Sequence, residues 1–141
     1  MTNTLLHVLV IDDDDVTHET VERCLRRVET RFRVVTAIDG QDGLDVLRGK
    51  SDRKLQRPYI ILLDLNMPRM NGFEFLETMR ADPALRDSIV FVLSTSDSDA
   101  DRARAYNEFI AGYMVKSALG AQFTKLAQLL QSFSTTVTLP T

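Results

Sequence analysis

Short apolar runs alternate along the chain with segments whose apolar residues recur every three or four positions. The apolar runs predict buried strands over Leu6–Ile11, 33–37, Tyr59–Leu63, 89–93 and Gly112–Val115. The helical spacing predicts helices over 21–28, 40–48, 73–79, 99–109 and 123–130. Parallel strands need crossover connections, so five such pairs indicate an α/β protein with one parallel sheet covered on both faces.

The predicted helix over 99–109 differs from the others because its apolar face is mostly alanine. We therefore expect it to pack loosely. Four acids in this region, Asp97, Asp99, Asp101 and Glu108, have the spacing of a calcium-binding loop. Arg102 stands where that loop needs glycine, so an acidic helix start is the preferred interpretation.

Length and composition describe an ordinary globular protein. Of the 141 residues, 44% are hydrophobic and 26% charged, and we expect one domain over 1–141 with no output domain. The net charge of −3 provides no general basic surface for nucleic acid. No apolar run approaches the roughly 18 residues of a membrane span, and MTNTLLHVLV is no secretion signal, so we expect a cytoplasmic protein.

Some reactive or charged residues have simple structural interpretations. Cys24 lies on an apolar helical stripe and is predicted to be a buried thiol. His7 is expected at a strand start, and His18 is expected to face solvent. The connection over 49–58, which carries four Lys and Arg residues, is predicted to be a solvated loop.

Polar side chains follow the apolar runs directly. In chain order the strands deliver Asp12 and Asp13, Asp64, Ser94 and Thr95, and Lys116. The carboxyl ends of parallel strands meet at one edge of a sheet, so these groups should converge. Three nearby carboxylates raise one another's pKa unless a cation lies among them, and oxygen ligands favour Mg²⁺. Lys116 and Ser94 are the partners that the oxygens of a phosphoryl group would need.

Four segments resemble the motifs of response regulator receiver domains in order and spacing. They are VLVIDD at 8–13, ILLDLNMPRMNG at 61–72, FVLST at 91–95 and GYMVK at 112–116. The resemblance covers nearly the whole chain and implies a flavodoxin-like, doubly wound five-stranded sheet of order 2-1-3-4-5. It also implies a phosphorylation-activated signalling switch rather than a turnover enzyme. The long connection before the third strand and the VTLP ending resemble single-domain regulators associated with bacterial phytochromes.

The resemblance assigns a role to each matching residue. Asp64 would be the phosphoacceptor and Lys116 its phosphate partner. The Mg²⁺ ligands would be Asp12, Asp13, Asp64 and the backbone carbonyl of Asn66. Ser94 and Tyr113 would form the switch, Asn66 and Ser96 would tune the lifetime of the phosphate, and Thr95 would tune access to the site. The implied partners are a histidine kinase, which the narrower resemblance suggests is of phytochrome type, and a downstream protein or phosphotransfer partner or a second copy of the chain.

Some residues depart from the family pattern or extend it. Ser117 follows Lys116 where the family usually has proline after a cis bond, so we expect a trans peptide. Thr95 is larger than the residue common there, which should narrow access for small phosphodonors. Phe109, Ile110 and Phe133 are predicted to offer apolar anchors for a partner or a second copy.

Other function classes are compatible with parts of the sequence. Asp13, Asp15 and Thr17 spell the D-x-D-x-T nucleophile motif of haloacid dehalogenase-type phosphatases, in which Asp13 would be the nucleophile. That interpretation leaves Asp64 without a role. The third class is a phosphate-independent interaction module in which the acids serve only as a charged scaffold.

Overall fold

One five-stranded parallel sheet of order β2-β1-β3-β4-β5 forms the centre of the computed structural model, which describes residues 5–141. Its strands are β1 (Leu6–Ile11), β2 (Phe32–Ala37), β3 (Tyr59–Leu63), β4 (Ile89–Ser94) and β5 (Gly112–Val115). The helices are α1 (Asp15–Arg26), α2 (Gly40–Leu47), α3 (Gly72–Ala81), α4 (Asp99–Tyr106) and α5 (Thr124–Thr136). Two 3-10 turns, Lys116–Ala118 and Ala121–Phe123, precede α5. The predicted class and strand order are confirmed.

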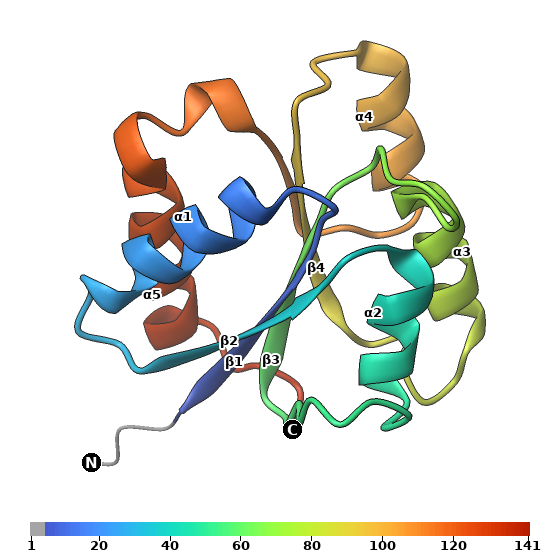
Figure 1. Cartoon of the computed structure of the whole chain (residues 1–141), viewed down its shortest axis with the longest axis horizontal. Coiled ribbons are helices and arrows are strands. Elements are labelled where there is room, and N and C mark those ends of the chain that lie inside the picture. Colours follow the sequence, from blue (N-terminus) through green and yellow to red (C-terminus); the bar gives the residue numbers. More distant parts are fainter. Residues whose placement is uncertain (1–4) are drawn as a thin grey trace.

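Helices cover both faces of the sheet, with α1 and α5 on one side and α2, α3 and α4 on the other (Figure 1). Alternate residues of β1 enter the two resulting cores, Val8 and Val10 on the α1 and α5 side and Leu9 and Ile11 on the other. Because both faces are covered, every residue of β1 and β3 is buried. This double burial explains why those strands are almost entirely apolar in the sequence, with His7 of β1 as the exception.

The strand register brings two acids to the same edge. Ile11 of β1 pairs with Leu63 of β3, so the residues that follow, Asp12 and Asp64, leave adjacent strands at the same level. Backbone hydrogen bonds hold both, since the Asp64 N–H donates to Ile11 O at 2.9 Å and the Asp12 N–H donates to Ala37 O at 3.0 Å. The hydrophobic register of the sheet therefore positions the acidic edge.

The α4 helix is shorter and more loosely packed than its neighbours, as its composition predicts. The helix ends at Tyr106, whereas the sequence predicted an end at Phe109. Phe109 instead adopts a left-handed backbone (φ 60°), and the next residue, Ile110, is buried. Ala105 is the one buried residue of α4. Its acids lie in the first turn after the N-cap Ser98, which confirms an acidic helix start in place of a calcium loop.

One local prediction was wrong, because His18 does not face solvent but is 9% exposed. The connection over 49–58 has no buried residue, as predicted for a solvated loop. Two of its arginines form ion pairs, Arg53 with Asp42 and Arg57 with Asp87. The sequence did not indicate these pairs because the partners are 11 and 30 residues away.

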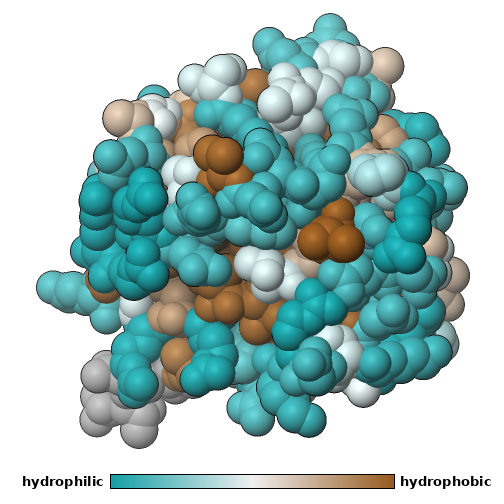
Figure 2. Space-filling model, in the orientation of Figure 1, coloured by the Kyte–Doolittle hydropathy of each residue, from teal (hydrophilic) through white to brown (hydrophobic). Residues whose placement is uncertain are grey.

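Two of the three predicted apolar anchors are not available to a partner. Ile110 is buried, and Phe133 packs edge-on against Phe91 with ring centroids 5.2 Å apart. Phe109 is 80% exposed, as predicted. The face of the molecule seen in Figure 2 is largely hydrophilic, with hydrophobic residues in small separate spots. Within residues 5–141, no helix combines the length and apolar character needed to cross a membrane.

Other expectations are confirmed. Cys24 is buried, and this burial raises the pKa of its thiol to about 11, so it is protonated at neutral pH. The Lys116–Ser117 peptide is trans, since Arg57–Pro58 is the one cis bond among residues 5–141.

Candidate functional site

Three acids form a compact group at the carboxyl ends of β1 and β3. One carboxylate oxygen from each of Asp12, Asp13 and Asp64 lies within 4.8 Å of the others. Asp12 and Asp64 are buried, at 1% and 6% exposure, whereas Asp13 is exposed. The group therefore has a buried floor of two carboxylates and a third that faces solvent.

Lys116 is the cation in contact with this group. Its Nζ donates to Asp12 Oδ2 at 2.8 Å and to Thr17 Oγ1 at 3.1 Å. Lys116 follows β5, an edge strand, yet its side chain reaches the acid that follows β1. Thr17 was not predicted as a member of this site. Its place in the D-x-D-x-T pattern was a signal, but that pattern suggested a different chemistry.

The electrostatics of the pocket favour a divalent cation. Burial and, to a smaller extent, the nearby Asp12 carboxylate raise the pKa of Asp64 to about 6, although Lys116 and the N–H groups of Asn66 and Leu65 act in the opposite direction. Three carboxylates and one ammonium carry −3 + 1 = −2, which one divalent ion would neutralise. Oxygen donors of this kind fit a hard cation such as Mg²⁺.

A chain of hydrogen bonds connects the end of β4 to Tyr113 of β5. Ser94 is fully buried, and its Oγ accepts the Ser96 N–H at 3.1 Å. The Tyr113 hydroxyl donates to Ser96 O at 3.0 Å. Ser96 Oγ in turn donates to Asp101 Oδ2 of α4 at 2.6 Å. Ser96 thus links Ser94, Tyr113 and the first turn of α4.

The loop between β3 and α3 doubles back on the end of β3. The Gly72 N–H donates to Leu65 O at 3.0 Å, and a Cβ on Gly72 would lie 2.7 Å from Leu65 Cα, so only glycine fits this close approach. Asn71 then starts α3 with a capping box that includes Glu74. Asn66 lies on the exposed side of this loop.

The predicted site residues thus fall into distinct groups. The structure brings together Asp12, Asp13, Asp64 and Lys116. Ser94, Ser96 and Tyr113 form the hydrogen-bonded chain beside them. Thr95 and Asn66 are exposed on the loops after β4 and β3.

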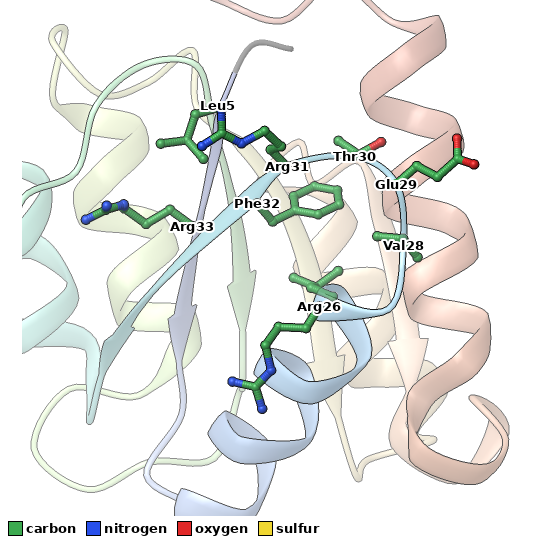
Figure 3. Close-up of a pocket in the computed structure, with 9 residues that line it drawn as sticks. Leu5, Arg26, Val28, Glu29, Thr30, Arg31, Phe32 and Arg33 are labelled. Carbon is green, nitrogen blue, oxygen red and sulfur yellow. The ribbon is translucent and has the colours of Figure 1, made fainter.

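A surface hollow lies at the opposite end of the sheet (Figure 3). It is bordered by the end of α1 and the start of β2, with Arg26, Phe32 and Arg33 among its lining residues. None of the predicted site residues lines it. The hollow is therefore separate from the acidic group.

Comparison with known proteins agrees with the arrangement at the carboxyl edge. Residues 8–128, which include every predicted site residue, match the response regulator receiver domain. The chain belongs to this family. Receiver domains are typically phospho-accepting switches rather than turnover enzymes, and phosphorylation-dependent signalling is what membership implies.

Phytochrome-associated regulators are among the similar proteins. The receiver chain is 30% identical over 135 residues to response regulator Rcp1 of Synechocystis sp., covering 94% of this chain and 92% of Rcp1. The Mn²⁺-bound structure of Rcp1 superposes with a TM-score of 0.84 at 29% identity, covering 96% and 99% of the two chains. The phosphorylated cyanobacterial phytochrome response regulator RcpA gives a TM-score of 0.85 at 31% identity, covering 96% and 98%.

Proposed function

We propose that this receiver domain is a switch in which Asp64 accepts a phosphoryl group from a histidine kinase. The observation that supports the proposal is the group of three carboxylates within 4.8 Å, with Lys116 hydrogen-bonded to Asp12. Asp64 is the buried acid at the end of the central strand β3 and has no ion-pair partner among residues 5–141. Of the two buried acids of this group, Asp64 is therefore the one with an oxygen available for bond formation, because Lys116 occupies Asp12.

In the proposed reaction, one Asp64 carboxylate oxygen attacks the phosphorus of the donor phosphohistidine. The new P–O bond forms as the P–N bond breaks, and the donor imidazole keeps the electron pair and takes up a proton. Asp12, Asp13, Asp64 and the carbonyl of Asn66 would hold Mg²⁺, which supplies charge neutralisation for the incoming phosphoryl oxygens. Lys116 is placed to turn from Asp12 toward a phosphoryl oxygen.

The Ser94–Ser96–Tyr113 chain supports a route for the signal. A phosphoryl group on Asp64 adds charge and acceptor oxygens to the pocket. A Ser94 hydroxyl that turns toward these oxygens stops accepting the Ser96 N–H. Ser96 also holds the Tyr113 hydroxyl and Asp101, so its displacement would shift Tyr113 and α4 together.

The proposed output is a protein contact on the face formed by α4, β5 and α5. Phe109 at 80% and Tyr106 at 47% exposure supply apolar area at the end of α4 and in the turn before β5. A downstream protein or a second copy of the chain would bind there. Sedimentation of phosphorylated and unphosphorylated protein separates the two, because identical monomers in both states would exclude the homodimer.

We propose a phytochrome-type kinase as the donor because Rcp1 and RcpA are similar over nearly the whole chain. Phosphotransfer profiling against a panel of purified histidine kinases tests this assignment. Preferential transfer from a phytochrome kinase is expected, and preference for another class would overturn this part of the proposal alone.

The lifetime of the phosphate is proposed to depend on Asn66 and Ser96, whereas Thr95 is proposed to limit the access of small phosphodonors. Asn66 and Thr95 are exposed beside the pocket, and Ser96 is held by Asp101. Replacing Thr95 with Ala should speed labelling by acetyl phosphate because it opens access to Asp64. An unchanged labelling rate would remove Thr95 from this role.

The central test is to map the phosphoryl group. The protein is incubated with a donor kinase, ATP and Mg²⁺, and the modified peptide is identified by mass spectrometry. We expect one phosphoryl group on Asp64 that is labile to base and to hydroxylamine, and none in Asp64→Asn. Asp87→Asn, which removes an acid from the opposite end of the sheet, is the matched control and should label normally. Phosphate on another residue would overturn the proposal.

The same variants separate the other function classes. Turnover of p-nitrophenyl phosphate that survives Asp64→Asn but not Asp13→Asn would favour the phosphatase with Asp13 as nucleophile. A partner that binds wild type and Asp64→Asn equally, with or without phosphodonor, would favour the phosphate-independent module.

A further inference from the structure

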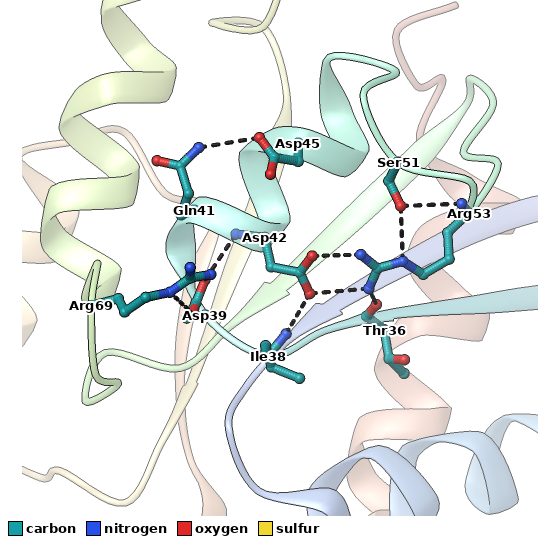
Figure 4. A network of polar contacts seen from close by, with 9 residues as sticks. All are labelled: Thr36, Ile38, Asp39, Gln41, Asp42, Asp45, Ser51, Arg53 and Arg69. Atoms are coloured by element: carbon teal, nitrogen blue, oxygen red, sulfur yellow. Dashed lines mark hydrogen bonds and ion pairs between the residues drawn. The ribbon is translucent and has the colours of Figure 1, made fainter.

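Arg69 and Asp39 form a two-pronged ion pair beside the candidate cation site (Figure 4). Arg69 Nε donates to Asp39 Oδ2 at 2.6 Å, and Nη2 donates to Oδ1 at 3.0 Å. Arg69 belongs to the loop between β3 and α3 that also carries Asn66, whereas Asp39 lies between β2 and α2. The pair therefore joins the loop of the cation site to a separate part of the fold.

Asp39 is a firm anchor because it is buried and already bound. Its exposure is 3%, and its Oδ1 also accepts the Asp42 N–H at 2.8 Å as the N-cap of α2. The neighbouring Arg69 guanidinium holds the pKa of Asp39 below its usual value, so the carboxylate is charged at neutral pH. Removing Arg69 would leave a buried charge without its cation.

The backbone around the pair is closely fitted. The Gly40 N–H donates to Met70 O at 2.9 Å, and a Cβ on Gly40 would lie 2.6 Å from Met70 Cγ. Arg69 itself has a left-handed backbone (φ 64°), which residues with a Cβ seldom adopt. The ion pair and the Gly40–Met70 hydrogen bond together oppose relaxation of this conformation.

The anchor extends further into the molecule. Asp42, which donates its N–H to Asp39, is bound through its own carboxylate by Arg53 (Figure 4). Arg53 also donates to Thr36 O of β2 at 2.6 Å. The loop is thus tied through Asp39 to the start of α2 and to the edge strand of the sheet.

We infer that Arg69 is a positioning residue for the cation site, because its pair with Asp39 holds the β3–α3 loop in the place that presents the Asn66 carbonyl. The inference rests on the proposed function, since it assigns Asn66 to Mg²⁺. Arg69 is not proposed to touch the cation or the phosphoryl group. Its side chain is 62% exposed and directed to Asp39.

The test compares Arg69→Ala with a matched control, Arg57→Ala. Arg57 also forms a two-pronged pair with an aspartate, Asp87, but lies before β3, at the opposite end of the sheet. Mg²⁺ affinity is measured by calorimetry on the full chain. We expect Arg69→Ala to raise the Mg²⁺ Kd by about tenfold, the lower end of the range for residues that orient metal ligands. Arg57→Ala should leave this Kd unchanged.

A second readout uses metal-free protein. Amide hydrogen exchange at Gly40, whose N–H is bound to Met70, should accelerate in Arg69→Ala and not in Arg57→Ala. Arg69→Lys keeps the positive charge but cannot form two parallel hydrogen bonds to Asp39. Its Mg²⁺ Kd and its Gly40 exchange rate should therefore fall between those of wild type and Arg69→Ala. Asp39→Asn should reproduce Arg69→Ala, and the double variant should add nothing further.

The outcomes distinguish the inference from the function. Wild-type protein that binds Mg²⁺ and labels on Asp64, with an unchanged Mg²⁺ Kd in Arg69→Ala, would overturn the positioning role alone. Wild-type protein that does not bind Mg²⁺ would overturn the proposed function as well. Equal loss of Mg²⁺ affinity in Arg69→Ala and Arg57→Ala would show a general loss of stability and would also overturn the inference.

Discussion

The neighbouring helices α3 and α4 are attached to the same face of the sheet by different forces. Five residues of α3 are buried, among them Phe75, Leu76 and Met79, whereas α4 buries Ala105 alone. Polar contacts at the surface hold α4, including the hydrogen bond from Ser96 to Asp101 and the ion pairs of Arg102. Hydrophobic burial therefore attaches α3, whereas polar surface contacts attach α4.

This difference determines which element can respond to a charge at the site. Moving α3 would expose large apolar side chains, at about 25 cal/mol for each Å² of apolar surface. Moving α4 exchanges exposed hydrogen bonds and ion pairs for similar bonds to water, which costs little. Under the proposed function, a phosphoryl group, which supplies only a few charge-assisted hydrogen bonds, would therefore shift α4 but not α3.

The largest expected effect comes from breaking the attachment of α3. Phe75 is fully buried, so Phe75→Ala should lower the free energy of unfolding by about 3–5 kcal/mol. The matched change in α4, Tyr106→Ala, removes a ring that is 47% exposed and should cost only about 0.5 kcal/mol. Urea denaturation measures both values, and similar losses would contradict the comparison.

The next effect concerns the charge of Asp64 and its dependence on pH. Because the folded state raises the pKa of Asp64 from 3.8 to about 6, its contribution to stability is fully present below pH 3.8 and is lost as pH rises through 6. At pH 7 without metal, Asp64→Asn should be more stable than wild type by about 2–3 kcal/mol, at about 1.4 kcal/mol per pKa unit. The gain should nearly vanish at pH 4.

Urea titrations in the presence of EDTA across this pH range provide the measurement. The same variant sharpens the comparison of the helices through amide exchange at pH 7. The exchange rate of α3 amides that exchange by global unfolding should fall as stability increases, whereas the exchange rate of α4 amides should not change. A pH-independent difference between the two proteins would contradict the assigned cause.

A smaller effect is expected from the helix caps. Asn71 caps α3 and Ser98 caps α4, each by accepting a backbone N–H in the first turn. Asn71→Ala should cost about 1 kcal/mol of global stability. Ser98→Ala should instead fray α4 locally, because α4 can open without unfolding the core. For Ser98→Ala we expect faster exchange confined to α4 and an unchanged urea midpoint. Urea midpoints that fall equally in Asn71→Ala and Ser98→Ala would argue against this expectation.

The smallest effect is expected at Arg102. It pairs with Asp97 and Asp99, both largely exposed, and lies over the Tyr113 ring at 5.8 Å. Arg102→Ala should leave the thermal midpoint unchanged but increase exchange at the start of α4. A clear drop in the thermal midpoint would mean that this surface pair stabilises the whole fold.

The elements were predictable where one local signal dominates. The strands β1 and β3 are buried on both faces, so apart from His7 their residues are apolar, and the apolar runs end sharply at Asp12 and Asp64. The end of α4 was predicted less accurately, because the turn at Phe109 depends on the burial of Ile110 in the tertiary structure. His18 was misplaced for the same reason, since its burial depends on how α1 packs.

The candidate site was predictable in membership but not in its contacts. The acids and Lys116 follow strands, and strand ends converge in any parallel sheet. That Lys116 bonds Asp12 and Thr17 depends on the reach of a long side chain across the sheet edge. The hydrophobic periodicity of the sequence does not predict such a contact, and Thr17 was therefore missed.

The order of apolar and polar residues by itself determined the alternating strands and helices, the acidic edge and the weak attachment of α4. These properties follow from local periodicity and from the residue that ends each strand. Only the tertiary structure decided that Arg69 is bound to Asp39, that Ser96 joins Ser94 to Tyr113, and that Asp64 has a raised pKa. Those properties depend on distances and burial between residues far apart in the chain, which exist only once the sheet has assembled.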